Sequence, residues 1–287
     1  MATTVCLTFD FDAMSIWLGT FRLASPTPLS RGEFGARVGI DRILELLGSR
    51  GVKATFFVPG HTALTFPDAV SRIVEAGHEI AAHNDLHETP VGLMRNEEIA
   101  VFERAEAAIR TITAKRPVGY RSPAWDLSPQ TLELLVERGY LYDSSLMGDD
   151  FRPYRPQVTS AEDGEVRFGD PLPIWEFPVA WELDDYPYFH FSSRPLNQGL
   201  RPTEEVEALW LAEFDYCRNQ VSDGVFTLTT HPEIIGRGPR IAMLGRLIDA
   251  MQSAPDVTFT TMADAASELQ RRDHAPSAIR TASRGRP

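Results

Sequence analysis

The fold class predicted from the amino-acid sequence is α/β, with a mainly parallel sheet in an incomplete (β/α) barrel. Short stretches rich in β-branched and aromatic residues alternate along the chain with longer amphipathic segments. That alternation is typical of a parallel sheet covered by helices, and about seven such units suit a barrel. No internal repeat is present. We therefore expect a single domain over residues 1–270, followed by a basic, disordered tail over residues 271–287.

The first strand is expected at residues 5–11, close to the N-terminus. Its alternating side chains predict an apolar face packed under helices, made of Val5, Leu7, Phe9 and Phe11. The opposite face is small and polar, and it ends in Asp10 and Asp12. At the carboxyl end of a barrel strand, such a pair would project into the mouth of the barrel. A solvated strand end or a helix N-cap is the alternative for these two carboxylates.

The remaining elements follow from apolar periodicity and from helix start and stop signals. Gly51 ends one helix, and Ser128 with Pro129 begins another. Strands are expected at residues 53–58, 78–82, 118–121, 140–142, 174–179, 225–230 and 257–259. Helices are expected at residues 34–49, 67–76, 96–113, 128–139, 203–220, 239–252 and 263–270. Residues 13–31, 148–170 and 181–191 are expected to be irregular, and the last of these stretches is rich in aromatic residues.

Composition excludes several classes of partner. The net charge is −12, and no basic stripe precedes the last residues, so we expect neither nucleic-acid binding nor attraction to an acidic membrane. No apolar run is long enough to span a bilayer, and the early first strand leaves no room for a signal peptide. Cys6 and Cys217 are expected to be reduced, buried thiols. These features predict a cytoplasmic protein.

A second polar signal lies in the segment from His78 to His87. His83 and His87 have a spacing that lets two imidazoles reach one ion if the segment turns helically. Two unrelated surface histidines beside a turn are the alternative. His78 is expected to be a buried histidine that hydrogen-bonds the backbone. Because both polar signals follow strands of one sheet, a carboxylate with two histidines predicts an open, catalytic site for one divalent metal ion, with zinc as the first choice.

Four motifs in this order resemble the polysaccharide deacetylase family, the NodB-homology domain. They are Thr8-Phe9-Asp10-Phe11-Asp12, the pair His83 and His87, Arg121-Ser122-Pro123-Ala124-Trp125, and Leu228-Thr229-Thr230-His231-Pro232. The resemblance covers about residues 5–265. It implies a distorted (β/α) barrel of the NodB type and a metal-dependent hydrolase of carbon–nitrogen bonds other than peptide bonds.

The same resemblance implies a role for each motif residue. The metal ligands are Asp12, His83 and His87; Asp10 is the base that activates water, His231 the general acid, and Arg121 the residue that orients the base. Trp125 would form part of the substrate wall. If the family resemblance is set aside, Arg121 would be interpreted as a turn residue anchored by a surface carboxylate. His231 would be interpreted as a strand-end histidine capped by Pro232.

The sequence departs from the family pattern at two points. Most members carry adjacent aspartates, whereas Phe11 separates Asp10 from Asp12, which leaves open which aspartate binds the metal. The usual tryptophan motif is also not obvious. Trp181-Glu182-Leu183-Asp184-Asp185 takes its place in our interpretation, with Asp184 or Asp185 pairing to His231, and a solvated acidic loop is the alternative.

The segment 30–35 and the residues His231-Pro232 with 236–240 resemble a subgroup of peptidoglycan-deacetylase-like proteins and metal-independent allantoinases, whose members tend to be tetramers. The resemblance therefore implies a homo-oligomer. The presence of Asp12, His83 and His87 favours the metal-dependent side of this subgroup. Arg31 and Arg37 could reach the site, or hold a loop or a subunit interface. The expected substrate is a small molecule or oligosaccharide, first an N-acetylated amino sugar and second a small cyclic amide or ureide. A catalytically silent sugar-binding protein on the same fold is the rival from another class.

Overall fold

The computed structural model describes residues 2–193 and 196–274. Its main sheet has eight strands in the order β11-β1-β2-β3-β4-β5-β8, and β12 pairs with the first residues of β1. Every pairing within this sheet is parallel. The strands are β1 (Thr3–Asp10), β2 (Thr55–Val58), β3 (Glu79–Ala82), β4 (Gly119–Tyr120), β5 (Tyr142–Asp143), β8 (Trp175–Glu176), β11 (Val225–Thr230) and β12 (Val257–Phe259). The predicted α/β class and distorted barrel are confirmed.

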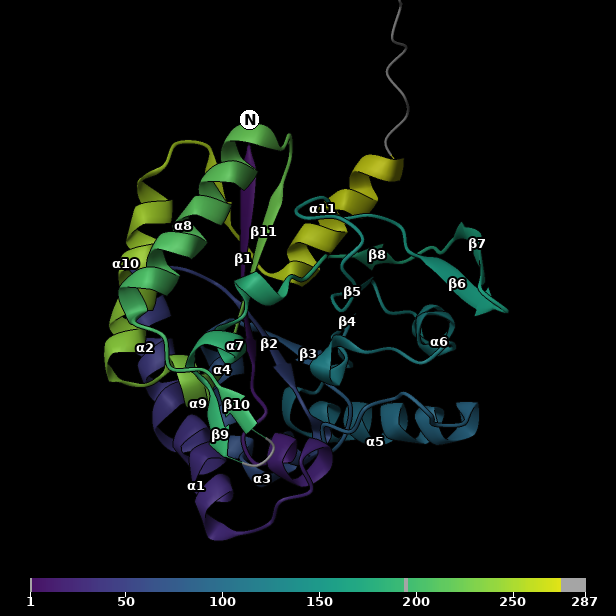
Figure 1. Ribbon diagram of the computed structural model, residues 1–287, viewed down its shortest axis with the longest axis horizontal. Helices are drawn as coiled ribbons and strands as arrows, with labels where there is room; N and C mark the ends of the chain where they lie inside the picture. Colours follow the sequence, from purple (N-terminus) through teal and green to yellow (C-terminus); the bar gives the residue numbers. More distant parts are fainter. Residues whose placement is uncertain (1, 194–195, 275–287) are drawn as a thin grey trace, which may run out of the picture.

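Helices pack around this curled sheet (Figure 1). They are α1 (Pro26–Phe34), α2 (Ile40–Arg50), α3 (Gly60–Thr65), α4 (Pro67–Glu75), α5 (Arg95–Thr113), α6 (Thr131–Glu137), α7 (Asp185–Phe189), α8 (Thr203–Gln220), α9 (Pro232–Ile235), α10 (Gly238–Ser253) and α11 (Met262–His274). Two π-helical turns, η1 (Ile16–Thr20) and η2 (Gly35–Gly39), and two 3₁₀ turns, η3 (Pro123–Trp125) and η4 (Trp181–Leu183), complete the helical elements. No helix within the described residues is long and apolar enough to cross a bilayer.

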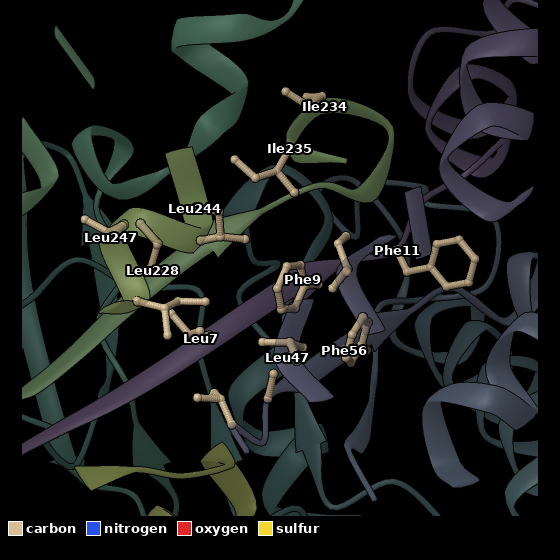
Figure 2. Packing of buried hydrophobic residues seen from close by; sticks show 14 of the residues in the cluster. Leu7, Phe9, Phe11, Leu47, Phe56, Leu228, Ile234, Ile235, Leu244 and Leu247 are labelled. Carbon is tan, nitrogen blue, oxygen red and sulfur yellow. The ribbon is translucent and has the colours of Figure 1, made fainter. Parts of the chain in front are cut away.

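The apolar face of β1 forms the centre of the largest core cluster. Leu7 and Phe9 are buried there with side chains of α2 and α10, among them Leu47, Leu244 and Leu247 (Figure 2). Phe9 stacks on Phe56 of β2 with ring centroids 4.8 Å apart. The predicted alternation of β1 is therefore correct, and it leaves Asp10 at the opposite face.

Several local predictions need correction. The helix expected at residues 34–49 begins earlier, because Pro26 and Pro28 lie in the first turn of α1, where proline is tolerated. Residues 13–31 are thus largely helical, and α3 was missed. The stretch 148–170 contains an antiparallel hairpin, β6 (Gln157–Glu162) and β7 (Glu165–Pro171). Asp163 and Gly164 turn it with positive φ angles of 51° and 82°.

Other corrections concern the ends and the small elements. A second small hairpin joins β9 (Phe191–Ser193) to β10 (Leu196–Gln198). Helix α11 continues to His274, past the predicted boundary at residue 270, and the rest of the predicted tail lies outside the described residues. Cys6 and Cys217 are buried and unpaired, as expected. His78 is also buried, and its Nδ1 accepts the N–H of Ala54 at 3.1 Å.

Candidate metal centre and catalytic cavity

The polar residues predicted from separate motifs meet at one end of the sheet. Asp10 is the last residue of β1, His83 directly follows β3, Arg121 follows β4, and His231 follows β11. Because these strands are parallel, their carboxyl ends lie at the same edge. A single parallel bridge between Asp184 and Thr229 brings the acidic loop to this edge as well.

Asp12, His83 and His87 form a buried cluster whose ligand atoms all lie within 4.8 Å of one another. The Asp12 carboxylate oxygens lie 3.4 Å from His83 Nε2 and 3.3 Å from His87 Nε2. Neither oxygen has a hydrogen-bond partner among the described residues, although Asp12 is fully buried. Burial alone would raise the pKa of Asp12, but His87, His83 and His231 together lower it to about 2. An ionised, unpartnered carboxylate that faces two imidazoles fits a divalent metal ion.

The Nδ1 atoms of His83 and His87 each contact a polar group that fixes the orientation of the ring. His83 Nδ1 lies 2.7 Å from the carbonyl oxygen of Arg121, and His87 Nδ1 lies 2.6 Å from Thr20 Oγ1. Such contacts hold Nε2 of each ring toward the ion site. The spacing of the two histidines predicted that the segment between them would turn helically, but this segment is not helical. Asn84 and His87 instead adopt positive φ angles of 55° and 59°, and Asn84 Oδ1 accepts the Tyr120 hydroxyl at 2.8 Å.

Asp10 is held by Arg121 rather than by the histidines. Arg121 Nη1 donates to Asp10 Oδ1 at 2.7 Å and to Thr8 Oγ1 at 2.8 Å. Its other nitrogens bond to the carbonyl and hydroxyl of Ser144 at 3.0 and 2.9 Å. Arg121 and its partner Asp10 are both buried, so the alternative of a turn residue anchored by a surface carboxylate is wrong. Asp10 Oδ2 lies 3.9 Å from His83 Nε2, beside the ligand cluster.

His231 also lies beside Asp12, with its Nε2 3.8 Å from Asp12 Oδ2. Its Nδ1 lies 2.7 Å from Asp185 Oδ1, and its backbone N–H donates to the same carboxylate. Asp184 lies farther away, at 3.6 Å, and caps α7 through Tyr186 N–H. Burial alone would lower the pKa of His231, but Asp184 and Asp185 raise it well above its ordinary value. Of the two candidates, Asp185 is therefore the one hydrogen-bonded to His231.

The ligand cluster opens into a cavity of about 210 Å³. Trp125 lines it, as predicted, and stacks on Trp181 with ring centroids 4.3 Å apart. Thr20 and Tyr186 also line it and were not predicted. The aromatic richness of residues 181–191 was a usable signal for Trp181 and Tyr186. For η1 the signal was coarser, because the stretch 13–31 is long for a plain connection and follows directly on Asp12.

The chain is similar to known proteins over most of its length. Residues 3–142 match the family model described as Polysaccharide deacetylase. A relative from Helicobacter pylori, named peptidoglycan deacetylase, is 34% identical over 278 residues, covering 92% of this chain and 95% of the relative. A Mycobacterium smegmatis structure assigned to the polysaccharide deacetylases has a TM-score of 0.85 and 34% identity, covering 100% and 94% of the two chains. The Puue allantoinase has a TM-score of 0.75 over 94% and 90%, and its 23% identity indicates a common fold alone.

Proposed function

The chain belongs to the polysaccharide deacetylase family, and from this premise we propose that it removes the acetyl group from an N-acetylated amino sugar in a metal-dependent hydrolysis. The observation that carries the proposal is the pair of buried, unpartnered oxygens of Asp12, which face Nε2 of His83 and His87. Two histidines and one carboxylate are the protein ligands of open, catalytic zinc sites. Zinc is therefore our first choice for the ion.

We assign the attack step to Asp10. When bound, the metal would polarise the amide carbonyl and lower the pKa of a water from about 15.7 toward about 7. Asp10 takes a proton from the attacking water, whose oxygen bonds to the carbonyl carbon. Its carboxylate suits this role because Arg121 holds one oxygen at 2.7 Å and leaves the other beside the ligand cluster. A fixed base reacts faster because it needs no reorientation.

We assign the departure step to His231. As the carbon–nitrogen bond breaks, His231 gives a proton to the leaving nitrogen, and the products are a free amine and acetate. Asp185 accepts from Nδ1 and so directs Nε2 toward Asp12 and the cavity. This carboxylate also favours the protonated imidazolium, which is the form a general acid needs.

The catalytic cavity also supports a second candidate substrate. Its volume of about 210 Å³ is small for a ligand site, where roughly 300–1,000 Å³ is usual. A small cyclic amide or ureide would fit within it, whereas a longer sugar chain would have to extend past Trp125 and Trp181. Both substrates contain a carbon–nitrogen bond next to a carbonyl group, so we assign the same base, acid and metal ligands for either.

We also propose a homo-oligomer, with a tetramer as first choice, and a cytoplasmic location. Exposed aromatic side chains at Trp181 and Phe191 support the first proposal, and the two buried, unpaired cysteines support the second. Light scattering at micromolar concentration should give a multiple of the 32.0 kDa chain mass. A monomer mass would contradict the oligomer.

The decisive experiment combines metal analysis with a hydrolysis assay. We expect about one divalent ion per chain and release of acetate from N-acetylated amino sugars. The double variant His83→Ala, His87→Ala should fold, lose the ion and lose activity. His61→Ala is the matched control, because His61 is a half-buried histidine outside the ligand cluster. A metal-loaded chain that hydrolyses neither amino sugars nor ureides would instead favour the silent sugar-binding protein.

A further inference from the structure

Thr20 makes two contacts with a single residue of the ligand cluster. Its Oγ1 lies 2.6 Å from His87 Nδ1 and donates to the His87 carbonyl oxygen at 2.8 Å. The other histidine, His83, has a backbone group beside its Nδ1, the carbonyl of Arg121. Thr20 is therefore a side chain through which the surroundings of a ligand imidazole can be changed without replacing the ligand itself.

The two contacts of Thr20 determine where the ring hydrogen of His87 lies. A hydroxyl has one hydrogen, and a carbonyl oxygen can only accept. If the hydroxyl donated to His87 Nδ1, two oxygens would face each other at 2.8 Å with no hydrogen between them. Both contacts are satisfied when the hydroxyl donates to the carbonyl and accepts from Nδ1–H. His87 is then the tautomer whose Nε2 lone pair is free, on the side of Asp12.

The turn that carries Thr20 also packs closely against the backbone of His87. A Cβ atom built on Gly19 would overlap the Leu86 carbonyl oxygen and would lie 3.1 Å from the His87 carbonyl carbon. His87 has a φ angle of 59°, which costs a non-glycine residue free energy unless its surroundings hold it. The bond from Thr20 to the His87 carbonyl is such a contact. One hydroxyl therefore holds both the backbone and the ring of this residue.

The position of Thr20 connects two strands that contribute to the metal centre. Thr20 is the last residue of η1, which begins shortly after Asp12 at the end of β1, whereas His87 belongs to the loop after β3. Thr20 also lines the catalytic cavity together with Ile16. Single turns of π-helix occur frequently at functional sites, and here the turn brings a hydroxyl from one strand end to a ligand on another.

We propose that Thr20 is a positioning residue of the metal centre, whose hydroxyl sets the tautomer of His87 and thereby the affinity for the divalent ion. The inference rests on the metal site of the proposed function and extends it to a residue outside the four motifs. Without the hydroxyl, Nδ1 of His87 can lose its hydrogen to Nε2, the nitrogen that must be free to bind the ion. Removing such a contact typically lowers metal affinity about 10–100-fold.

The test compares Thr20→Val, which keeps the shape and removes the hydroxyl, with Thr20→Ser, which keeps the hydroxyl. Competition with a chromogenic chelator measures the Kd of the full chain for Zn²⁺. We expect Thr20→Val to raise this Kd about 10–100-fold and Thr20→Ser to restore most of the affinity. Thr65→Val is the matched control, because Thr65 is also exposed and donates to a histidine carbonyl, that of His61, at 2.7 Å. Its Kd should equal that of the unmodified chain.

Nitrogen NMR of the metal-free chain, at a pH where the ring is neutral, reports the tautomer directly. We expect the ring hydrogen of His87 on Nδ1 in the unmodified chain and in Thr20→Ser, and partly on Nε2 in Thr20→Val. Comparison with His87→Ala assigns the signal. Circular dichroism and thermal melting check folding, and Thr20→Ala is a second variant without the hydroxyl.

Four results would overturn the role of Thr20. They are an unchanged Kd in Thr20→Val and Thr20→Ala, a loss in Thr20→Ser as large as in Thr20→Val, an equal loss in Thr65→Val, and a His87 ring in Thr20→Val that keeps its hydrogen on Nδ1. A loss of affinity confined to the two variants without the hydroxyl, with the change of tautomer, supports the inference even if the zinc-loaded chain hydrolyses no amide. Absence of hydrolysis would count against the proposed function alone.

Discussion

At the scale of single residues, Asp10 and Asp12 differ in what surrounds them. Asp12 has two unpartnered oxygens facing imidazoles, whereas one oxygen of Asp10 is bonded to Arg121. We expect Asp12→Asn to lose the metal and the activity together. Asp10→Asn should keep the metal, while kcat falls by about 10²–10⁴ because the base is gone. Metal content and kcat measured on the same preparations check this, and the reverse pattern would show that the two aspartates are wrongly assigned.

His231 should matter most for substrates whose leaving amine is a poor leaving group. A general acid lowers the barrier by protonating the nitrogen as the bond breaks, and an activated amide needs less of that help. We expect His231→Ala to lower kcat more on an N-acetyl amino sugar than on an activated anilide. The ratio of the two losses is the measurement. Equal losses on both substrates would contradict the role of general acid.

The convergence of Asp10 and His83 could be predicted from the sequence because both end strands of one parallel sheet, whereas Arg121 and His231 were identified through the resemblance to the family. Asp10, His83, Arg121 and His231 each lie at or just after the end of a strand of one parallel sheet. Thr20 and the conformations of Asn84 and His87 could not be predicted. They depend on a π-helical turn and on left-handed backbone angles in loops, and no periodic pattern in the sequence encodes these features.

At the scale of elements, α9 is held against η2 by close backbone contact. A Cβ atom built on Gly39 would lie 2.3 Å from the Pro232 carbonyl oxygen. Gly39→Ala should therefore push α9 away and destabilise the fold by about 1–3 kcal/mol. Because α9 directly follows His231, kcat should fall as well. Urea unfolding and kcat measure both effects.

Gly48→Ala is the matched control for this prediction. Gly48 lies in α2, the helix that continues from η2, and a Cβ atom added to it would have no neighbour within 4 Å. Alanine is the better helix former, so this variant should gain about 0.5–1 kcal/mol. Equal effects of the two substitutions would exclude close packing at Gly39 as the cause.

Long periodic elements were predicted well, and short ones were not. The predicted range of α8 is the observed Thr203–Gln220, because 18 residues give a clear amphipathic period. Helix α3 spans only 6 residues, Gly60–Thr65, too few for a period to be recognised. The β6–β7 hairpin was missed although Asp163-Gly164 is a strong turn signal, because its charged strands resemble a loop.

At the scale of the whole molecule, the sheet continues from the site to a buried carboxylate pair that the mechanism does not use. Asp143 and Glu176 are partners in the β5–β8 ladder, and both are fully buried. Glu176 Oε1 accepts the N–H groups of Ser145 and Leu146 at 2.9 Å each, and Asp143 Oδ1 accepts the Ser145 hydroxyl at 2.8 Å. The other oxygens, Asp143 Oδ2 and Glu176 Oε2, are buried without a hydrogen-bond partner among the described residues, and two buried negative charges side by side are disfavoured, which favours a proton on the pair.

This pair should make the stability of the fold depend on pH. Burial raises the pKa of Asp143 from 3.8 to about 6, and burial with the Asp143 charge raises the pKa of Glu176 well above its ordinary value. The folded chain therefore holds protons that the unfolded chain releases. The resulting stability is fully present below about pH 4 and is lost as the pH rises through about 6 and beyond.

Glu176→Gln supplies a permanent N–H donor to Asp143 and keeps an acceptor for the two backbone N–H groups. Its free energy of unfolding, relative to the unmodified chain, should rise between pH 5 and pH 9 by on the order of 2 kcal/mol, because one pKa unit corresponds to about 1.4 kcal/mol. Urea titrations at several pH values measure this difference. Glu45→Gln is the control, since Glu45 is exposed, and its difference should stay flat. A Glu176→Gln difference that is also flat, or that falls with pH, would mean that the pair does not hold a proton at neutral pH.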